Sequence, residues 1–101
     1  MNHRHRDFGH VSIATLERLL YTRCVRGAPQ DAVSTPAQLA REYIDRRRWK
    51  LVEISEPGQY TATVTVPMPR IESYEVKGRD RERVLLIATL LADGVDAEEI
   101  L

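Results

Sequence analysis

Cysteine, tryptophan and phenylalanine are nearly missing from this sequence of 101 residues, which contains one of each. The single cysteine, Cys24, cannot form an internal disulfide, so we expect a reducing, cytoplasmic location rather than a disulfide-built secreted fold. Long apolar runs are also missing, since no stretch approaches the roughly 20 residues that a membrane-spanning helix needs. The polar start MNHRHRDFGH has no apolar segment behind it of the kind that a signal peptide carries. We therefore expect no membrane partner.

The motifs of common enzyme classes are missing as well. The sequence has no Gly-rich phosphate loop, no nucleophile elbow and no zinc-protease motif. Cys24 is more easily explained as a small core residue than as a nucleophile. The acidic residues Asp93, Asp96, Glu98 and Glu99 lie at a helix end and a helix cap, where capping accounts for them without acid–base chemistry. We therefore expect no catalytic residue and no cofactor, and predict that the protein is not an enzyme.

Three histidines, His3, His5 and His10, could be combined with Cys24 into a metal site. Their spacing lacks the cysteine pair or the His-x3–5-His arrangement of structural zinc sites. We interpret residues 1–9 as a flexible polar tail rich in His and Arg, and expect no metal site.

Charge is unevenly distributed although the formal net charge is zero. Residues 1–50 carry ten Lys and Arg against five Asp and Glu, a net charge of +5, and residues 51–101 carry five against ten, a net charge of −5. One hypothesis is a basic face that meets phosphate or an acidic partner. The other is that the two halves neutralise each other within the fold or within a dimer.

Two helices are predicted in the first half of the chain. Apolar residues recur at spacings of three and four within residues 10–26, which predicts an amphipathic helix. The stretch RGAPQDAVS ends it. Thr35 then suits an N-cap, Pro36 the first helical position and Gln38 the third position of a capping box. This second helix is expected to run to about Arg48.

The period changes from 3.6 to 2 after the second helix. Residues 51–55 and 71–77 are predicted strands, with a turn at Pro57-Gly58. Between them, YTATVTV at 60–66 alternates apolar residues with threonines, as in a half-buried antiparallel strand. A helix is predicted over residues 81–92, and a terminal turn is predicted over residues 94–101. Asp80 is predicted to cap that helix, and Asp96 with Glu99 is predicted to cap the turn.

The element order α–α–β–β–β–α predicts an α+β fold in which helices cover one face of a three-stranded antiparallel sheet. We expect a single domain over residues 10–101.

The last predicted helix is apolar on nearly every side. A stripe of Val84, Ile87, Ala88 and Leu91 suits contact with the sheet, while Leu86 with Leu90 and Leu85 point in other directions. Such a helix must be covered on more than one side, either by the first helix or by a second copy of the protein.

The stretch EYIDRRRWKLVEI, within the α–β–β–β–α order of residues 35–93, resembles the double-stranded-RNA-binding domain. The matching positions carry a helix glutamate, a basic turn, an aromatic residue and a Lys-Leu-x-Glu sequence into the first strand. These residues are Glu42, Arg47, Trp49, Lys50, Leu51 and Glu53. The resemblance implies a dsRBD-like fold with an added first helix at 10–26, and recognition of duplex RNA by shape.

Two of the three RNA-contacting surfaces of that family depart from its pattern here. Glu42 matches the first surface, but the turn EPGQ is short and has no histidine. At the start of the last helix only Arg81 keeps a cation, with Arg79 and Arg83 as stand-ins. Glu82 and Leu85 replace family lysines. Because each lost phosphate contact weakens binding, this pattern favours a family member used for protein contacts.

Two functions therefore stay open. The first is a small regulator or inhibitor, for example a phage-encoded one, that binds a protein or ribonucleoprotein partner or self-associates into a homodimer. Its expected protein interface consists of Leu85, Leu86 and Leu90.

The alternative is direct double-stranded RNA binding, or binding of an acidic partner. The residues expected to carry it are Glu42, Arg46, Arg47, Arg48, Lys50, Arg79, Arg81 and Arg83. The triple arginine could instead be a solvated helix end that complements the helix dipole, with at least one arginine lying along Trp49 or a neighbouring strand.

Overall fold

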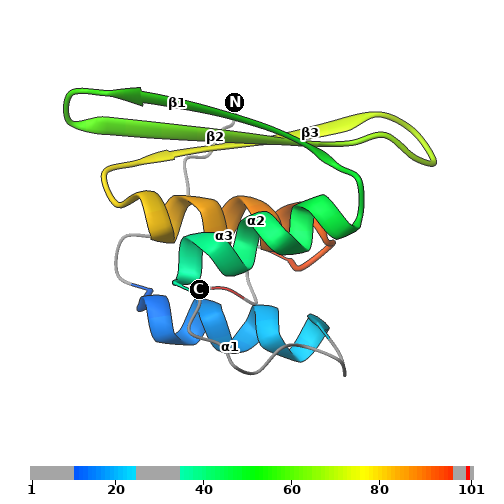
Figure 1. Cartoon of the computed structure of the whole chain (residues 1–101), viewed down its shortest axis with the longest axis horizontal. Helices are drawn as coiled ribbons and strands as arrows, with labels where there is room; N and C mark the ends of the chain where they lie inside the picture. Colours follow the sequence, from blue (N-terminus) through cyan, green and yellow to red (C-terminus); the bar gives the residue numbers. More distant parts are fainter. Residues whose placement is uncertain (1–10, 25–34, 97–99, 101) are drawn as a thin grey trace.

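Six regular elements make up the computed structural model, which describes residues 11–24, 35–96 and 100. In chain order they are α1 (Ile13–Cys24), α2 (Pro36–Arg46), β1 (Lys50–Glu56), β2 (Gln59–Val66), β3 (Glu72–Gly78) and α3 (Arg81–Ala92). The predicted α+β class, with helices on one face of a three-stranded antiparallel sheet, is confirmed (Figure 1). The predicted tail at 1–9, the three histidines and the Glu99 cap lie outside the described residues.

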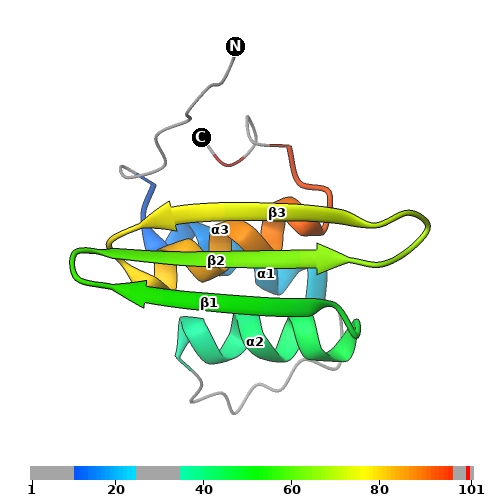
Figure 2. The same ribbon diagram turned by 90° about the horizontal axis from the view of Figure 1, so that it is seen from above.

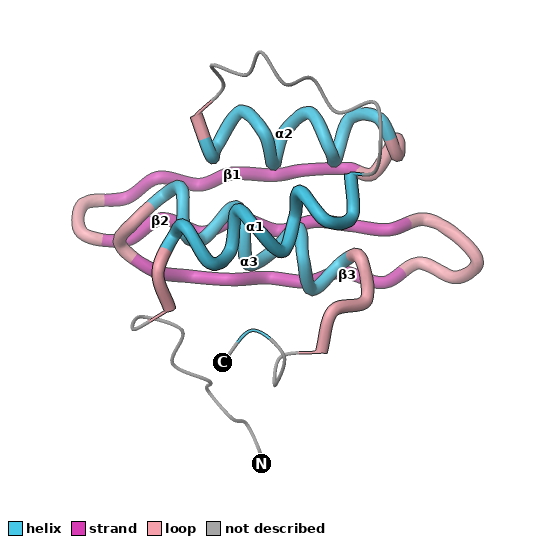
Figure 3. The backbone as a smooth tube through the Cα atoms, turned by 90° about the horizontal axis from the view of Figure 1, so that it is seen from below, coloured by secondary structure: helices cyan, strands magenta, loops and turns pink. Residues whose placement is uncertain are grey.

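The elements form three layers. Figure 1 shows the sheet above, α2 and α3 in the middle and α1 below. Seen from above in Figure 2, α3 runs beneath the sheet while α2 lies beside the β1 edge. Figure 3, from below, shows α1 lying across α3. One face of the sheet is therefore covered by helices, and the other is covered by none of the described elements.

The sheet follows the alternation of its sequence except at Thr61, which is 6% exposed although the pattern predicts it on the outer side. Tyr60, Ala62 and Val64 on β2 are buried at 6, 0 and 0% exposure, as predicted from YTATVTV. The β1–β2 hairpin closes through the two-residue turn Pro57-Gly58. Gly58 has a φ of +77°, the left-handed conformation that the third position of a type II turn requires. Pro57 supplies the fixed φ of the position before it.

The helix α3 is buried nearly all round, because the sheet covers one side and α1 packs on the other. Leu16 and Leu20 of α1 are fully buried in the same core cluster as α3. The first helix thus provides the second cover that the apolar sequence requires. The prediction of a partner surface on this helix is wrong: its three leucines are each 0% exposed inside the chain's own core. They are Leu85, Leu86 and Leu90.

The ends of the helices follow their capping residues. The predicted capping box of α2 is confirmed: the Gln38 amide donates to Thr35 Oγ1 at 3.2 Å and the Thr35 amide donates to Gln38 Oε1 at 3.0 Å. Asp80 caps α3 by accepting from the Glu82 amide at 3.1 Å. The second helix ends at Arg46, two residues before the predicted Arg48.

Candidate functional site

The sheet separates the predicted basic residues into two groups. Lys50 pairs with Thr65 at one end of the β1–β2 ladder, and Glu56 pairs with Gln59 at the other. The turn from α2 into β1 therefore lies at the end of the sheet that also carries the β2–β3 loop, whereas α3 begins at the opposite end (Figures 1 and 2). Seven strand residues separate these ends by about 20 Å. Arg46, Arg47, Arg48 and Lys50 consequently cannot act together with Arg79, Arg81 and Arg83 at one point.

Arg47 belongs to the packing of the helices. Its guanidinium carbon lies 3.9 Å from the ring centroid of Tyr43 and 5.8 Å from that of Trp49. Its Nε is 3.6 Å from Asp93 Oδ1, and the other carboxylate oxygen of Asp93 is 2.8 Å from Arg23 Nε. The expectation that one arginine of the triplet lies along Trp49 is confirmed. Asp93, interpreted from sequence only as a helix-end residue, connects the ends of α1, α2 and α3.

Arg48 has a backbone role. It has a φ of +60° just after α2. The Arg48 amide donates to the Asp45 carbonyl at 2.9 Å, and the Trp49 amide to the Ile44 carbonyl at 3.1 Å. This pair of bonds is the Schellman arrangement that ends helices, in which a left-handed residue is required. The side chains of Arg46 and Arg48 are exposed and are in none of the ion pairs of the described residues.

The loop between β2 and β3 carries the most exposed large apolar side chains of the described residues. Met68 is 72% exposed and Ile71 76% exposed, with the exposed Arg70 between them. Pro67 and Pro69 flank Met68 and restrict the backbone of the loop. We call this region the arginine end. It consists of Arg46, Arg48, Lys50, Met68, Arg70 and Ile71.

At the opposite end, a recess of about 290 Å³ lies between the hairpin turn and the start of α3. Arg79 and Arg81 line it together with Gln59 and the carboxylate of Glu56. Arg83, predicted as a third cation here, is instead engaged in the fold.

The side chain of Arg83 is held by two groups of the chain itself. Its Nε donates to the Val11 carbonyl at 3.0 Å, and a terminal nitrogen lies 3.8 Å from Asp80 Oδ2. Arg83 therefore attaches Val11, two residues before α1, to α3. Of the three cations predicted at this end, only Arg79 and Arg81 remain available to a ligand.

A polar network that sequence reasoning did not find joins α2 to the sheet. Arg41 donates to both oxygens of Glu53, from Nε at 3.0 Å and from a terminal nitrogen at 2.6 Å, and the Tyr60 hydroxyl donates to the same carboxylate. The hydrogen bonds from Arg41 lower the pKa of Glu53. Burial and the neighbouring Glu53 raise the pKa of Tyr60 to about 12. The family resemblance had matched Glu53 by spacing alone, with no partner assigned to it.

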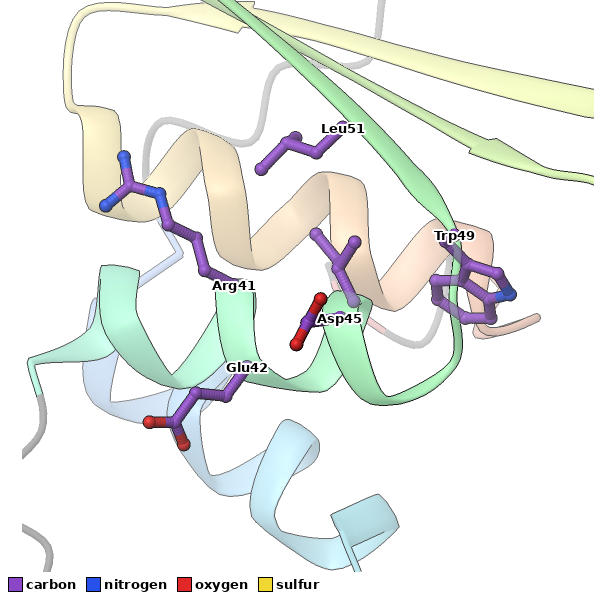
Figure 4. A pocket seen from close by; sticks show the side chains of 6 residues that line it. Arg41, Glu42, Asp45, Trp49 and Leu51 are labelled. Carbon is purple, nitrogen blue, oxygen red and sulfur yellow. The ribbon is translucent and has the colours of Figure 1, made fainter.

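An open groove of about 480 Å³ runs between α2 and β1. Figure 4 shows Trp49 and Leu51 on its sheet side, with Arg41, Glu42 and Asp45 along α2. Glu42, which matches the first RNA-contacting surface of the family, points away from the sheet (Figure 4). Two carboxylates beside this groove repel rather than attract phosphate.

The described residues form neither a metal-binding cluster nor a membrane-spanning helix. Within residues 11–24, 35–96 and 100, no group of three or more His, Cys, Asp or Glu side chains is placed to hold a metal ion. None of the helices in that part of the chain is long and apolar enough to cross a membrane.

Comparison of the chain with family models, with curated proteins and with solved structures finds no match in any of the three. Function is therefore inferred from the described side chains.

Proposed function

We propose that this chain is a non-enzymatic interaction protein that binds a protein partner through its arginine end. The partner's segment carries acidic side chains for Arg46, Arg48, Lys50 and Arg70, and an apolar anchor that packs against the β2–β3 loop. A small protein that covers a partner's surface in this way acts as a regulator or inhibitor of that partner.

The observation that carries the proposal is the placement of Met68 and Ile71. Both are more than 70% exposed in one proline-flanked loop, next to cations that form no ion pair within the described part of the chain. A methionine side chain adapts to varied apolar surfaces, and buried apolar anchors contribute most of the binding energy of protein interfaces. Cations around such an anchor steer an acidic partner and select it.

Duplex RNA is the second candidate, because the α–β–β–β–α order resembles the double-stranded-RNA-binding domain and Arg79 with Arg81 lines a recess beside the hairpin. Two features argue against it. Arg47 and Arg83 are engaged within the fold. The remaining cations are few and are divided between the two ends of the sheet, so that each end can contact only a few phosphates.

Selection of random displayed peptides of about 12 residues on the immobilised protein tests the proposal. We expect enriched peptides to combine Asp or Glu with a Leu, Phe or Trp anchor, and to lose binding to the Met68→Ser/Ile71→Ser variant. Tyr21→Ser is the matched control, since it removes another exposed apolar side chain, on α1, that is 39% exposed. Enriched peptides without acidic residues, or equal binding to the double variant, would contradict the proposal.

A further inference from the structure

None of the described elements covers the second face of the sheet, which we call the outer face. Its side chains are those that alternate along each strand with the helix-facing ones: Lys50, Val52, Ile54, Glu56, Gln59, Thr61, Thr63, Thr65, Ser73, Glu75 and Lys77. Most of them are exposed or half-buried, whereas Thr61 in the middle of the face is 6% exposed among its neighbours. The described helices all lie on the opposite side (Figure 1). Val52 and Ile54 are 46 and 49% exposed here, which leaves two neighbouring aliphatic side chains of one strand without cover.

The strand register arranges the outer face in rows that cross the sheet. One row is Val52, Thr63 and Glu75, because Thr63 pairs with both of the others. The next row is Ile54, Thr61 and Lys77, by the same pairing of Thr61. Each row therefore has an aliphatic residue on β1, a threonine on β2 and a charged residue on β3, and the charges of the two rows have opposite sign. Lys50 continues β1 beyond the first row, and Glu56 continues it beyond the second.

We infer that the outer face binds the outer face of a second copy of this chain. The two copies are related by a two-fold axis that is parallel to the sheet, perpendicular to the strands and midway between the two rows. This rotation places each strand over the same strand of the second copy, and the first row of one copy over the second row of the other. Val52 then faces Ile54 of the second copy, Thr63 faces Thr61, and Glu75 faces Lys77. Further out, Lys50 faces Glu56.

Each of these contacts occurs twice, as an isologous interface requires. Sheets pack face to face about 10 Å apart with their strands aligned within about 30°, so neighbouring rows can meet in this manner.

The charges also select this arrangement over its main competitor. A two-fold axis along β2 would place Val52 over Glu75 of the second copy and Ile54 over Lys77, so that both aliphatic side chains would meet charged groups. Covering a charge with an aliphatic side chain carries a desolvation cost that the first arrangement avoids. The order of residues along the strands thus fixes the relative orientation of the two copies.

The area of the outer face determines how tightly the two copies are expected to bind. Three strands about 4.8 Å apart and seven residues long, at about 3.4 Å each, give a footprint of roughly 350 Å². A standard interface buries about 800 Å² per partner, so this dimer belongs with the weak, transient interfaces. It goes beyond the proposed function, because Lys50 is the one residue that the outer face shares with the arginine end and the two aliphatic-centred rows lie outside that end.

Sedimentation equilibrium at concentrations around 100 µM tests the inference through charge reversal. Glu75→Lys places two lysines opposite each other in the homodimer, and Lys77→Glu places two glutamates opposite each other. We expect each single variant to dimerise at least about tenfold more weakly than the natural sequence. An equimolar mixture of the two variants, and the double variant Glu75→Lys/Lys77→Glu, should regain dimerisation, because both restore opposite charges across the axis.

Glu42→Lys and Arg18→Glu are the matched controls, since they reverse exposed charges on α2 and α1, away from the outer face, and should leave dimerisation unchanged. Circular dichroism verifies that all variants fold. A natural sequence that is monomeric at these concentrations would overturn the inference. So would charge reversals without effect, or single variants that fail to recover when mixed. None of these results bears on the peptide selection, which reads the arginine end.

Discussion

The guanidinium group of Arg47 lies over the ring of Tyr43, with 3.9 Å between its central carbon and the ring centroid. The same group approaches Asp93 at the end of α3. Arg47 therefore joins α2 to α3 and is a packing residue, although it stands in the middle of a triple arginine that suggests a ligand-binding cluster.

The three arginines should accordingly differ in what they contribute to stability. Arg47→Ala removes the cation–π contact, the ion pair and the packing of the side-chain stem. We expect it to lower the free energy of unfolding by about 1–2 kcal/mol. Arg46→Ala should change it by less than about 0.5 kcal/mol, as exposed surface residues do. Urea unfolding of both variants measures the difference, and equal effects would contradict the structural role of Arg47.

A substitution at Arg48 should raise the free energy of unfolding instead of lowering it. Its φ of +60° is costly for a residue with a side chain and costs glycine little. Arg48→Gly should therefore raise the free energy of unfolding by up to about 1 kcal/mol. At the equivalent position after α3, Gly94 has a φ of +98°, so Gly94→Ala should lower it by a similar amount. Thermal unfolding of the two variants should show melting temperatures that shift in opposite directions.

The buried leucines of α3 give a test of the third layer. Leu86 is 0% exposed on α3, which packs between the sheet and α1, so Leu86→Ala should cost about 2–5 kcal/mol of stability. Leu16→Ala, on the facing helix, should cost an amount in the same range. An exposed partner-binding leucine would lose less than about 0.5 kcal/mol. Urea unfolding that shows such a small loss for Leu86→Ala would mean that α1 does not cover α3.

Elements and faces were predictable from this sequence, because each depends on residues close together in the chain. The alternation in YTATVTV, the capping box of Thr35 with Gln38, and the turn at Pro57-Gly58 each specify local geometry. The apolar residues on nearly every side of α3 also predicted that a second element must cover this helix. What the sequence left open was the source of that cover, since the first helix and a second copy satisfy the same pattern.

The candidate site was much less predictable. Side chains such as Arg47, Arg83 and Asp93 are assigned by contacts between elements that are distant in the chain. Arg83, for instance, donates to the carbonyl of Val11, 72 residues away. Counting cations predicts a basic surface but cannot say which of them the fold engages. The exposed Met68 and Ile71 were missed because the loop carries no periodic pattern, although VPMPRI has one apolar residue between its prolines and another shortly after them.

The Arg41–Glu53–Tyr60 network should make stability depend on acid. The pKa of Glu53 is lowered in the fold, so the unfolded chain binds its proton more readily and stability rises with pH in this range. The contribution is present above the ordinary carboxyl value of 4.5 and is lost as the pH falls through the lower folded pKa.

Glu53→Gln should therefore cost about 1–2 kcal/mol at neutral pH, a figure reduced for the partial exposure of the pair. The difference between natural protein and variant should shrink as the pH falls from 5 to 3. Urea unfolding across this range measures it, with Glu42→Gln as the control on the exposed side of α2. A difference that is independent of pH would contradict the assigned network.

The class of partner is tested most directly by titrating the protein into an RNA duplex of about 20 base pairs, long enough for a domain that recognises duplex shape. Gel-shift titrations at about 50 mM and about 150 mM salt distinguish binding that depends on phosphate contacts, which weakens with salt, from binding that does not. We expect weak binding or none at low salt and no complex at the higher concentration, because Arg47 and Arg83 are engaged within the fold and few cations remain for phosphate contacts. A complex that persists at about 150 mM salt and is abolished by Arg79→Glu/Arg81→Glu would contradict the proposed protein-binding function and establish the RNA interface instead.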